Sequence, residues 1–394
     1  MLMEHAGRNV FLLACCQALL FTNNVTLIAL NGLAGFALAD NKALATLPVT
    51  GYVLGAALAT FPASLWMKRV GRRNGFLTGT LFGIAGGAIA TLGIYLSSFW
   101  TLVFGTLVLG TYNAFGQYYR FAAADAAPLK WKAKAISLVM AGGLVGGIIG
   151  PEMSKVTRDL VQPTFIASYA SLIGFCLVTM AILAGLRIPD PKDEEAHGAA
   201  RPLKEIMVQP VFIVAVVVGA LGYGVMNLLM TSTPLAMGFC GHPYSAAASV
   251  ISAHVIAMFG PSFFTGSLIQ RFGVLNVMMA GVASMLACVS IALSGQLVHH
   301  FWWSLVLLGV GWNFMYVGGT TLLTEAYRPA EKAKAQGANE ILVFCTTATS
   351  SFTSGVLVNA AGWNTLNYVA LPFLAIAGSA ALWLTLRRRS AAAA

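Results

Sequence analysis

The chain has 394 residues, of which 58% are hydrophobic and only 9% are charged. This composition excludes an ordinary water-soluble globular domain and indicates that most of the surface faces lipid. The net charge of +10 could suggest a nucleic-acid-binding protein, but the basic residues fall mainly in alternate loops between apolar runs, where the positive-inside rule explains them. We therefore expect membrane lipid, and no nucleic acid, as a partner.

Apolar runs as long as a membrane span recur along the whole chain. A helix needs roughly 20 apolar residues to cross a hydrocarbon core of about 30 Å. Runs of this kind, bounded by charges or by Gly and Pro, predict twelve spans. They cover residues 9–36, 44–67, 75–96, 98–122, 133–157, 164–186, 209–236, 246–270, 274–296, 301–325, 335–358 and 364–386. The first run is too long for a cleaved signal peptide and is expected to be a spanning helix.

The lysines and arginines indicate the orientation of these spans. Most of the 23 basic residues lie in the loops on one side of the predicted arrangement. Because loops rich in Lys and Arg stay in the cytoplasm, both termini are predicted to be cytoplasmic. We expect a multi-pass protein of a bacterial-type inner (plasma) membrane.

The sequence contains an internal repeat with an offset of about 200 residues. Asn113 and Asp125, at the end of the fourth span, correspond to Asn313 and Glu325 at the end of the tenth. A second similarity relates segment 68–71, after the second span, to segment 270–273, after the eighth. Two matches at nearly one offset indicate that the halves of the chain are related.

An even number of spans separates the copies, so the two halves have the same orientation in the membrane, which is a parallel repeat. We predict an all-α integral membrane protein with two six-helix bundles, at residues 1–186 and 209–394. A polar cytoplasmic linker at 187–208 joins them, and the substrate path is expected to run between the halves.

The segment Met67-Lys-Arg-Val-Gly-Arg-Arg73 resembles the signature loop that follows the second helix in the major facilitator superfamily. The usual Asp of that loop is replaced here by Lys68 or Arg69. The resemblance implies the major facilitator fold and secondary active transport. No phosphate-binding loop, metal-hydrolase motif or activated nucleophile is recognisable, so we do not expect an enzyme.

Two pairs of side chains on the seventh and eighth spans could bind a metal. Met226 and Met230 lie four residues apart, as do His254 and Met258, so each pair projects from one face of its helix. If the two spans are antiparallel neighbours, all four side chains lie at similar depth. Thioethers and an imidazole form a soft, uncharged ligand set that suits Cu(I). A methionine pair alone is more often a packing feature.

These paired motifs resemble those of the CcoA-like copper importers within the same superfamily. The resemblance implies copper uptake for haem-copper oxidase assembly, with copper as the transported substrate, no resident cofactor and a cytoplasmic copper chaperone as a partner. The family also uses thiols, and Cys240 and Cys345 are the candidates here.

Three charged residues lie within or at the ends of predicted spans. Arg120 and Asp125 belong to the inner end of the fourth span, and Glu340 lies inside the eleventh. Charges in a membrane are costly and usually have partners. One hypothesis is that Glu340 or Asp125 titrates during transport with Arg120 as counter-charge. The other is a gate of salt bridges.

Further polar and aromatic side chains predict a cavity lining, and they would equally suit a small organic solute such as a vitamin, a drug or a metal chelate. They are Asn23, Asn24, Thr26, Asn31, Asn113, Gln117, Tyr223, Asn227, Trp312, Asn313 and Tyr316. A transporter of such a solute is the main alternative to copper import. A copper-binding sensor or assembly factor is the alternative from another functional class.

Overall fold

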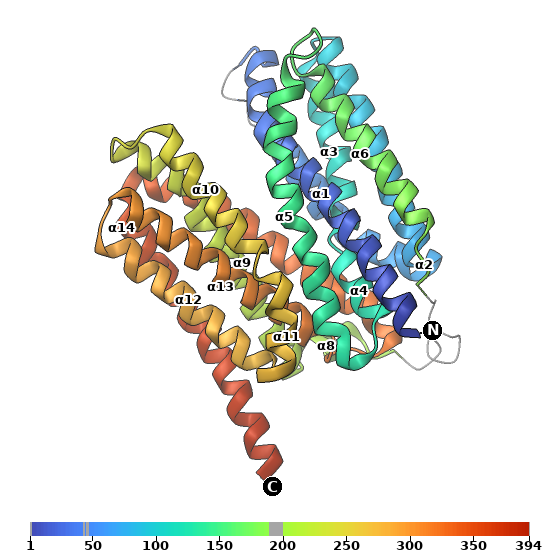
Figure 1. Ribbon diagram of the computed structural model, residues 1–394, viewed down its shortest axis with the longest axis vertical. Coiled ribbons are helices and arrows are strands. Elements are labelled where there is room, and N and C mark those ends of the chain that lie inside the picture. Colours follow the sequence, from blue (N-terminus) through green and yellow to red (C-terminus); the bar gives the residue numbers. More distant parts are fainter. Residues whose placement is uncertain (1, 42–43, 45–46, 189–199, 394) are drawn as a thin grey trace. The chain divides into compact units, whose positions relative to one another are not determined.

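A computed structural model describes residues 2–41, 44, 47–188 and 200–393, and within these residues every regular element is a helix (Figure 1). The chain divides into two compact units. Unit 1 comprises Met1–Pro128 and Gly142–Ala196, and unit 2 comprises Leu129–Ala141 and His197–Ala394. Unit 2 thus includes the start of the predicted fifth span. Half of the predicted linker, residues 189–199, lies outside the described residues.

Unit 1 contains long apolar helices and one short helix. They are α1 (Leu2–Leu38), α2 (Leu47–Tyr95), α3 (Phe99–Gly116), α4 (Tyr119–Ala126), most of α5 (Lys132–Arg158) and α6 (Ile166–Ala184). The 49 residues of α2 are interrupted at Gly71, which has φ 80° and ψ 164°. Because this left-handed backbone favours glycine, Gly71 separates the second and third predicted spans.

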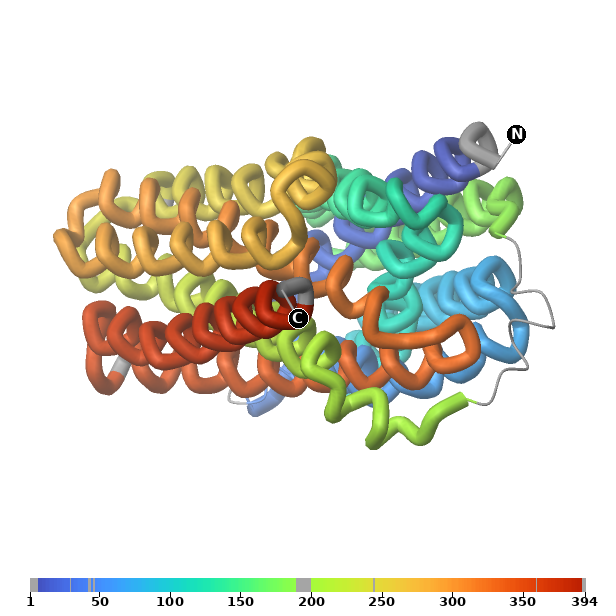
Figure 2. The backbone as a smooth tube through the Cα atoms, turned by 90° about the horizontal axis from the view of Figure 1, so that it is seen from below, coloured from blue at the N-terminus to red at the C-terminus, as the bar shows by residue number. Residues whose placement is uncertain are grey.

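Unit 2 begins with η2 (Leu129–Trp131) and the first turns of α5. It continues through α8 (Leu203–Met207), α9 (Pro210–Phe239), α10 (Tyr244–Phe259), α11 (Ser262–Phe272), α12 (Val274–Ser294), α13 (Val298–Leu323), η3 (Pro329–Glu331) and α14 (Lys332–Ala393). The 62-residue α14 is interrupted at Gly362, with φ 79°. The two segments of α14 turn back there and lie side by side (Figure 2).

Nine helices among the described residues are long and apolar enough to cross a membrane, and the bent pair α10 and α11 adds a tenth. One of the nine is the whole of α2, which the break at Gly71 divides into two predicted spans, and α3 corresponds to the predicted span 98–122. In the described part of the chain, each of the twelve predicted spans is therefore helical over most of its length. Two are not continuous: the fourth breaks after Gly116, and the eighth bends by 42° between Phe259 and Ser262.

Within unit 2, α13 packs mainly against three neighbouring helices, while α14 packs against α9 and α12. Helix α13 contacts α9, α10 and α12, whereas α9 and α10 meet along only a short stretch. Gly309 allows the approach of α10, because a Cβ there would lie 2.8 Å from the backbone oxygen of His254 and 2.8 Å from the nitrogen of Met258. Both α9 and α10 are therefore held against α13, and α9 also packs along α14.

An ion pair holds the second half of the predicted linker against the rest of unit 2. The Arg201 guanidinium donates to both carboxylate oxygens of Glu331, at 2.7 and 2.6 Å, and Glu331 is fully buried. Hydrogen bonding to Glu331 raises the pKa of Arg201. Gln209 adds a bond of 2.9 Å to the backbone oxygen of Ala326. These contacts hold the entry to α9 against the connection between α13 and α14.

Candidate functional site

Four aromatic side chains from three helices of unit 2 form one group, which we call the aromatic cluster: Tyr223, Phe259, Trp312 and Tyr316. The Trp312 ring is stacked on Tyr316, with centroids 5.1 Å apart and an interplanar angle of 20°. Tyr223 and Phe259 each meet Trp312 edge to face at 5.5 Å. Both geometries are favourable for aromatic pairs. Trp312 is therefore the centre of the cluster.

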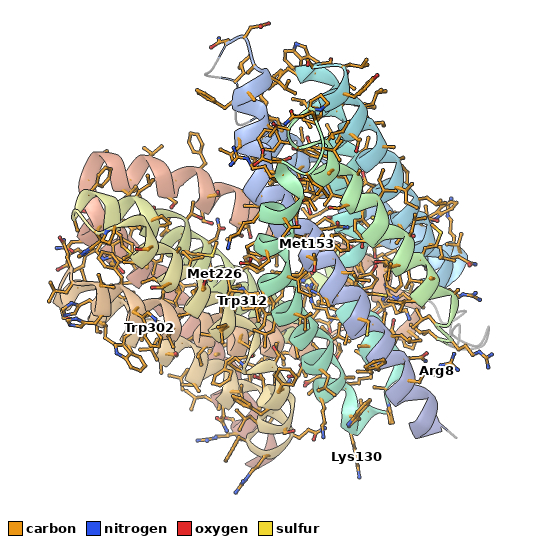
Figure 3. All side chains as sticks on the ribbon, turned by 45° about the horizontal axis from the view of Figure 1, so that its top comes forward. Arg8, Lys130, Met153, Met226, Trp302 and Trp312 are labelled. Carbon is orange, nitrogen blue, oxygen red and sulfur yellow. The ribbon has the colours of Figure 1, made fainter. Side chains whose placement is uncertain are left out.

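The members of the cluster differ in exposure. Trp312 and Phe259 are each 1% exposed, Tyr316 is buried, and Tyr223 is half-buried. Trp312 lies on α13, and Figure 3 labels it together with Met226 of α9. The indole Nε1 of Trp312 is buried and has no hydrogen-bond partner in the described part of the chain. Such an orphaned donor requires an explanation, and ligand binding is one.

Small residues on α9 bring Tyr223 to this position. Gly222 and Gly224 flank it, and their own faces are closely packed. A Cβ at Gly222 would lie 3.0 Å from the Cβ of Met315, and one at Gly224 would lie 2.8 Å from Cγ2 of Thr346. The glycines thus let α9 approach α13 and α14 on either side of Tyr223. An aromatic surface of this kind can stack on a planar ring.

Asn227, one turn after Tyr223, links α9 to α14. Its Nδ2 donates to the backbone oxygen of Thr347 at 3.2 Å and to Oγ of Ser350 at 3.1 Å. This predicted lining residue therefore lies one turn from the aromatic cluster, but its amide group donates hydrogen bonds to α14.

Asn313, also predicted as a lining residue, supports the bend between α10 and α11. Its Nδ2 donates to the Met258 backbone oxygen and to Ser262 Oγ, both at 2.6 Å, and its Oδ1 accepts from Thr265 at 2.7 Å. Asn313 is fully buried. Since Pro261 has no N–H to donate, the helix loses bonds here, and Asn313 supplies replacements.

The first turns of α5 add a second support to the bend. The Ser137 hydroxyl donates to the backbone oxygen of Ser262, and the Gly266 N–H donates to Ser137 Oγ at 3.0 Å. Gly266 is required at this contact, because a Cβ would lie 2.7 Å from the backbone oxygen of Ala133. The bend is thus built into the fold of unit 2.

Unit 1 contains a chain of polar contacts among residues predicted from sequence. Asn24 and Gln117 both donate to Oδ1 of Asn113, at 3.0 and 3.1 Å. Arg120 donates to the backbone oxygen of Gln117 at 2.9 Å and to its Oε1 at 3.3 Å. Tyr52 donates its hydroxyl proton to Oδ1 of Asn24. We call these residues the amide network, and Tyr52 is the member that sequence analysis missed.

The other predicted lining residues of α1 are buried in unit 1. Asn23 is 1% exposed and donates to Cys176 Sγ at 3.5 Å, while its Oδ1 has no described partner. Thr26 donates to the backbone oxygen of Gly150 at 3.1 Å. Asn31 accepts from the Tyr169 hydroxyl at 2.7 Å. These contacts join α1 to α5 and α6.

The four predicted copper ligands lie on two helices that both contact α13. Met226, Met258 and His254 are buried, and Met230 is half-buried. Nδ1 of His254 forms a hydrogen bond of 2.8 Å with the backbone oxygen of Leu305 on α13, and Nε2 has no described partner. If Nδ1 carries the proton, Nε2 is left as a lone-pair donor.

The cysteines are all free thiols. Cys240 donates to Oε1 of Gln296 at 3.3 Å, and Cys345 is exposed on α14. Among the described residues, no group of three or more His, Cys, Asp or Glu side chains could hold a metal ion. The methionines are outside that set, so the proposed Met and His ligation stays a prediction.

The predicted charged residues have polar partners in the described part of the chain, and their proposed roles in coupling or gating stay predictions. Asp125 forms an ion pair with Arg72 at 3.0 Å, whereas Arg120 hydrogen-bonds to Gln117. Glu340 is 1% exposed and accepts from the side chain of Asn339 at 2.6 Å. Arg72 belongs to the signature loop, which was the signal that could have identified it as the partner of Asp125.

The chain matches the family model of the Major Facilitator Superfamily over residues 10–261 and 241–394. It is 44% identical over 374 residues to the riboflavin transporter RfnT of Brucella anthropi. The match covers 94% of this chain and 94% of that protein. It is 30% identical over 348 residues to the uncharacterized MFS-type transporter YdeG of Bacillus subtilis, covering 83% of this chain and 80% of that protein.

Solved structures show the same fold at low sequence identity. FucP in the outward conformation superposes with a TM-score of 0.79 at 15% identity, over 95% of this chain and 98% of that one. The proton:xylose symporter XylE superposes with a TM-score of 0.78 at 13% identity, over 98% and 96% of the two chains. These two likenesses concern the fold alone.

Proposed function

Because the chain belongs to the major facilitator superfamily, we propose that it transports riboflavin or a closely related flavin across the membrane. It is a multi-pass membrane transporter and not an enzyme. The observation that carries the proposal is its 44% identity, over 94% of both chains, to a riboflavin transporter. This vitamin falls within the class of small organic solutes that the polar and aromatic residues suggested.

The aromatic cluster supports this substrate class. Riboflavin carries a planar, fused aromatic ring with carbonyl and ring-nitrogen acceptors, and a hydroxylated ribityl chain. Tyr223, Trp312 and Tyr316 offer stacking surfaces, and Trp312 offers an unpartnered N–H. Binding sites for small molecules combine apolar and aromatic walls with a few well-placed polar groups. The cluster has that composition.

The copper proposal has weaker support. The 44% identical relative is named for riboflavin, so the expected membership among CcoA-like importers is not supported. Nε2 of His254 has no hydrogen-bond partner among the described residues, but Nδ1 holds the ring against Leu305 of α13. We therefore keep Met226, Met230, His254 and Met258 as residues to be tested rather than as the site of transport. A copper chaperone is not proposed as a partner.

The energy for transport is expected to come from an ion gradient, as in other secondary transporters of this superfamily. The buried Glu340 is our candidate for proton coupling. Carboxyl groups inside membranes are costly and commonly serve as proton relays. A bacterial plasma membrane is the proposed location.

Ligand-induced stabilisation of the purified full-length protein tests the substrate. A ligand that binds only the folded state raises the melting temperature with concentration. Riboflavin should raise it, whereas Cu(I) under reducing conditions should not. A rise with Cu(I) that is lost in the Met226/Met230/His254/Met258 quadruple alanine variant, without any rise with riboflavin, would reverse the proposal.

A further inference from the structure

Trp312 lies at the centre of the aromatic cluster. Its side chain is 1% exposed, and its Nε1 has no hydrogen-bond partner in the described part of the chain. We infer that the indole N–H of Trp312 donates a hydrogen bond to an acceptor on the ring of the transported flavin. This inference rests on the proposed function and assigns one specificity-determining contact within it.

The direction of this N–H is fixed by packing. Tyr316 covers a face of the indole at 5.1 Å, while Tyr223 and Phe259 approach it at interplanar angles of 80° and 76°. The three neighbours come from three different helices, so the indole cannot turn without moving several of them. A donor held in place before the ligand arrives loses little entropy when it binds.

The unpartnered state of this donor favours a ligand that can accept from it. A buried N–H without an acceptor costs free energy comparable to a lost hydrogen bond. A flavin ring presents carbonyl oxygens and ring nitrogens at its edge, and each can accept. An apolar ring of similar shape would leave the donor unpaired, and sites of this kind discriminate strongly against such analogues.

Tyr223 is the most exposed member of the aromatic cluster. It is half-buried, whereas the other three side chains are buried. In the proposed subsite Trp312 and Phe259 form the buried part, and Tyr223 is the more exposed part.

Titration of flavin fluorescence against the purified full-length protein in detergent micelles measures this contact. The probes are riboflavin and lumichrome, which has the ring but no ribityl chain. Trp312→Phe keeps an aromatic ring and removes the N–H. Trp303→Phe is the matched control, because Trp303 lies on the same helix and is 55% exposed. Trp312→Tyr and Trp303→Tyr form a second pair in case the phenylalanine variant does not insert.

We expect Trp312→Phe to weaken binding of riboflavin and lumichrome by the same factor, about tenfold, the size of one net hydrogen bond. Trp303→Phe should leave both affinities unchanged. Without ligand, Trp312→Phe should melt below the wild-type temperature, because the smaller ring leaves a cavity at the centre of the cluster. Affinities are therefore compared at a temperature where both proteins are folded.

Three results would overturn the inference. Wild-type affinity in the Trp312 variants would show that the N–H does not contact the flavin. A loss for riboflavin without a loss for lumichrome would place the contact on the ribityl chain. If the wild-type protein binds neither probe, the proposed function is wrong and the inference with it. This result differs from the other two, in which the wild-type protein binds flavin.

Discussion

Arg72 and Asp125 form an ion pair in which Nε and Oδ2 lie 3.0 Å apart, and this pair ties the segment after Gly71 to the end of α4. Both side chains are largely buried, at 7% and 15% exposure. The repeat does not preserve the pairing: Glu325, which corresponds to Asp125, pairs with the exposed Arg388 at 2.6 Å. Related positions in the two halves thus have different partners and different surroundings.

Asp125→Asn should destabilise the protein, because it removes the charge that faces Nε of the buried Arg72 guanidinium. Removing one partner of a buried pair typically costs about 3 kcal/mol. Glu325→Gln is the control, and loss of its exposed pair should cost about 1 kcal/mol or less. Thermal unfolding in detergent compares the two variants. Equal shifts in melting temperature would contradict a special role for the Arg72 pair.

Glu340→Gln should abolish the accumulation of substrate while leaving the exchange of substrate intact. If the buried carboxyl carries the coupling proton, the variant should still exchange substrate across a liposome membrane but should fail to accumulate it under a pH gradient. Asp125 is a weaker candidate, since it already forms an ion pair with Arg72. Glu325→Gln serves as a control. Wild-type accumulation with unchanged pH dependence in Glu340→Gln would exclude this role.

Asn313→Ala should destabilise the bend between α10 and α11. The substitution removes bonds to Met258, Ser262 and Thr265, and it strands buried polar groups at an expected cost of about 2 kcal/mol or more. Asn276→Ala on α12 is the control, since that exposed amide makes one local bond of 2.8 Å to Phe272. A melting temperature that falls no further in Asn313→Ala than in Asn276→Ala would argue against this support.

Tyr223→Ala should reduce flavin exchange about tenfold, since one aromatic contact contributes up to about 1.5 kcal/mol beyond its buried area. Tyr223→Phe retains the ring and should keep most of the exchange. Tyr368→Ala, at an exposed position on α14, controls for the loss of a tyrosine. Wild-type rates of flavin exchange in correctly inserted Tyr223→Ala protein would show that the aromatic cluster does not contact the substrate.

The spans could be predicted from sequence because run length and hydrophobicity are local properties. The two discontinuities could not, because they depend on distant partners. The bend after Phe259 is stabilised by Asn313 and Ser137, which lie more than 50 and more than 100 residues away along the chain. Sequence identified the polar Asn313 but not its structural use.

The same limit applies to the candidate site. The spacing of Met226 and Met230, or of His254 and Met258, places each pair on one helical face, but sequence does not reveal which helix that face meets. Both α9 and α10 contact α13, and the imidazole of His254 bonds to it. Of the predicted lining residues, Tyr223, Trp312 and Tyr316 do come together. Phe259 was missed because an apolar residue on a membrane helix carries no signal of its own.

Riboflavin counterflow in proteoliposomes tests the proposed function most directly, because exchange does not depend on the direction or the driving ion of net transport. Liposomes loaded with unlabelled riboflavin should take up external labelled riboflavin with the wild-type protein, unaffected by a copper chelator, and much less with Tyr223→Ala. Absence of riboflavin counterflow, together with Cu(I) uptake that disappears in the Met226/Met230/His254/Met258 quadruple alanine variant, would contradict it.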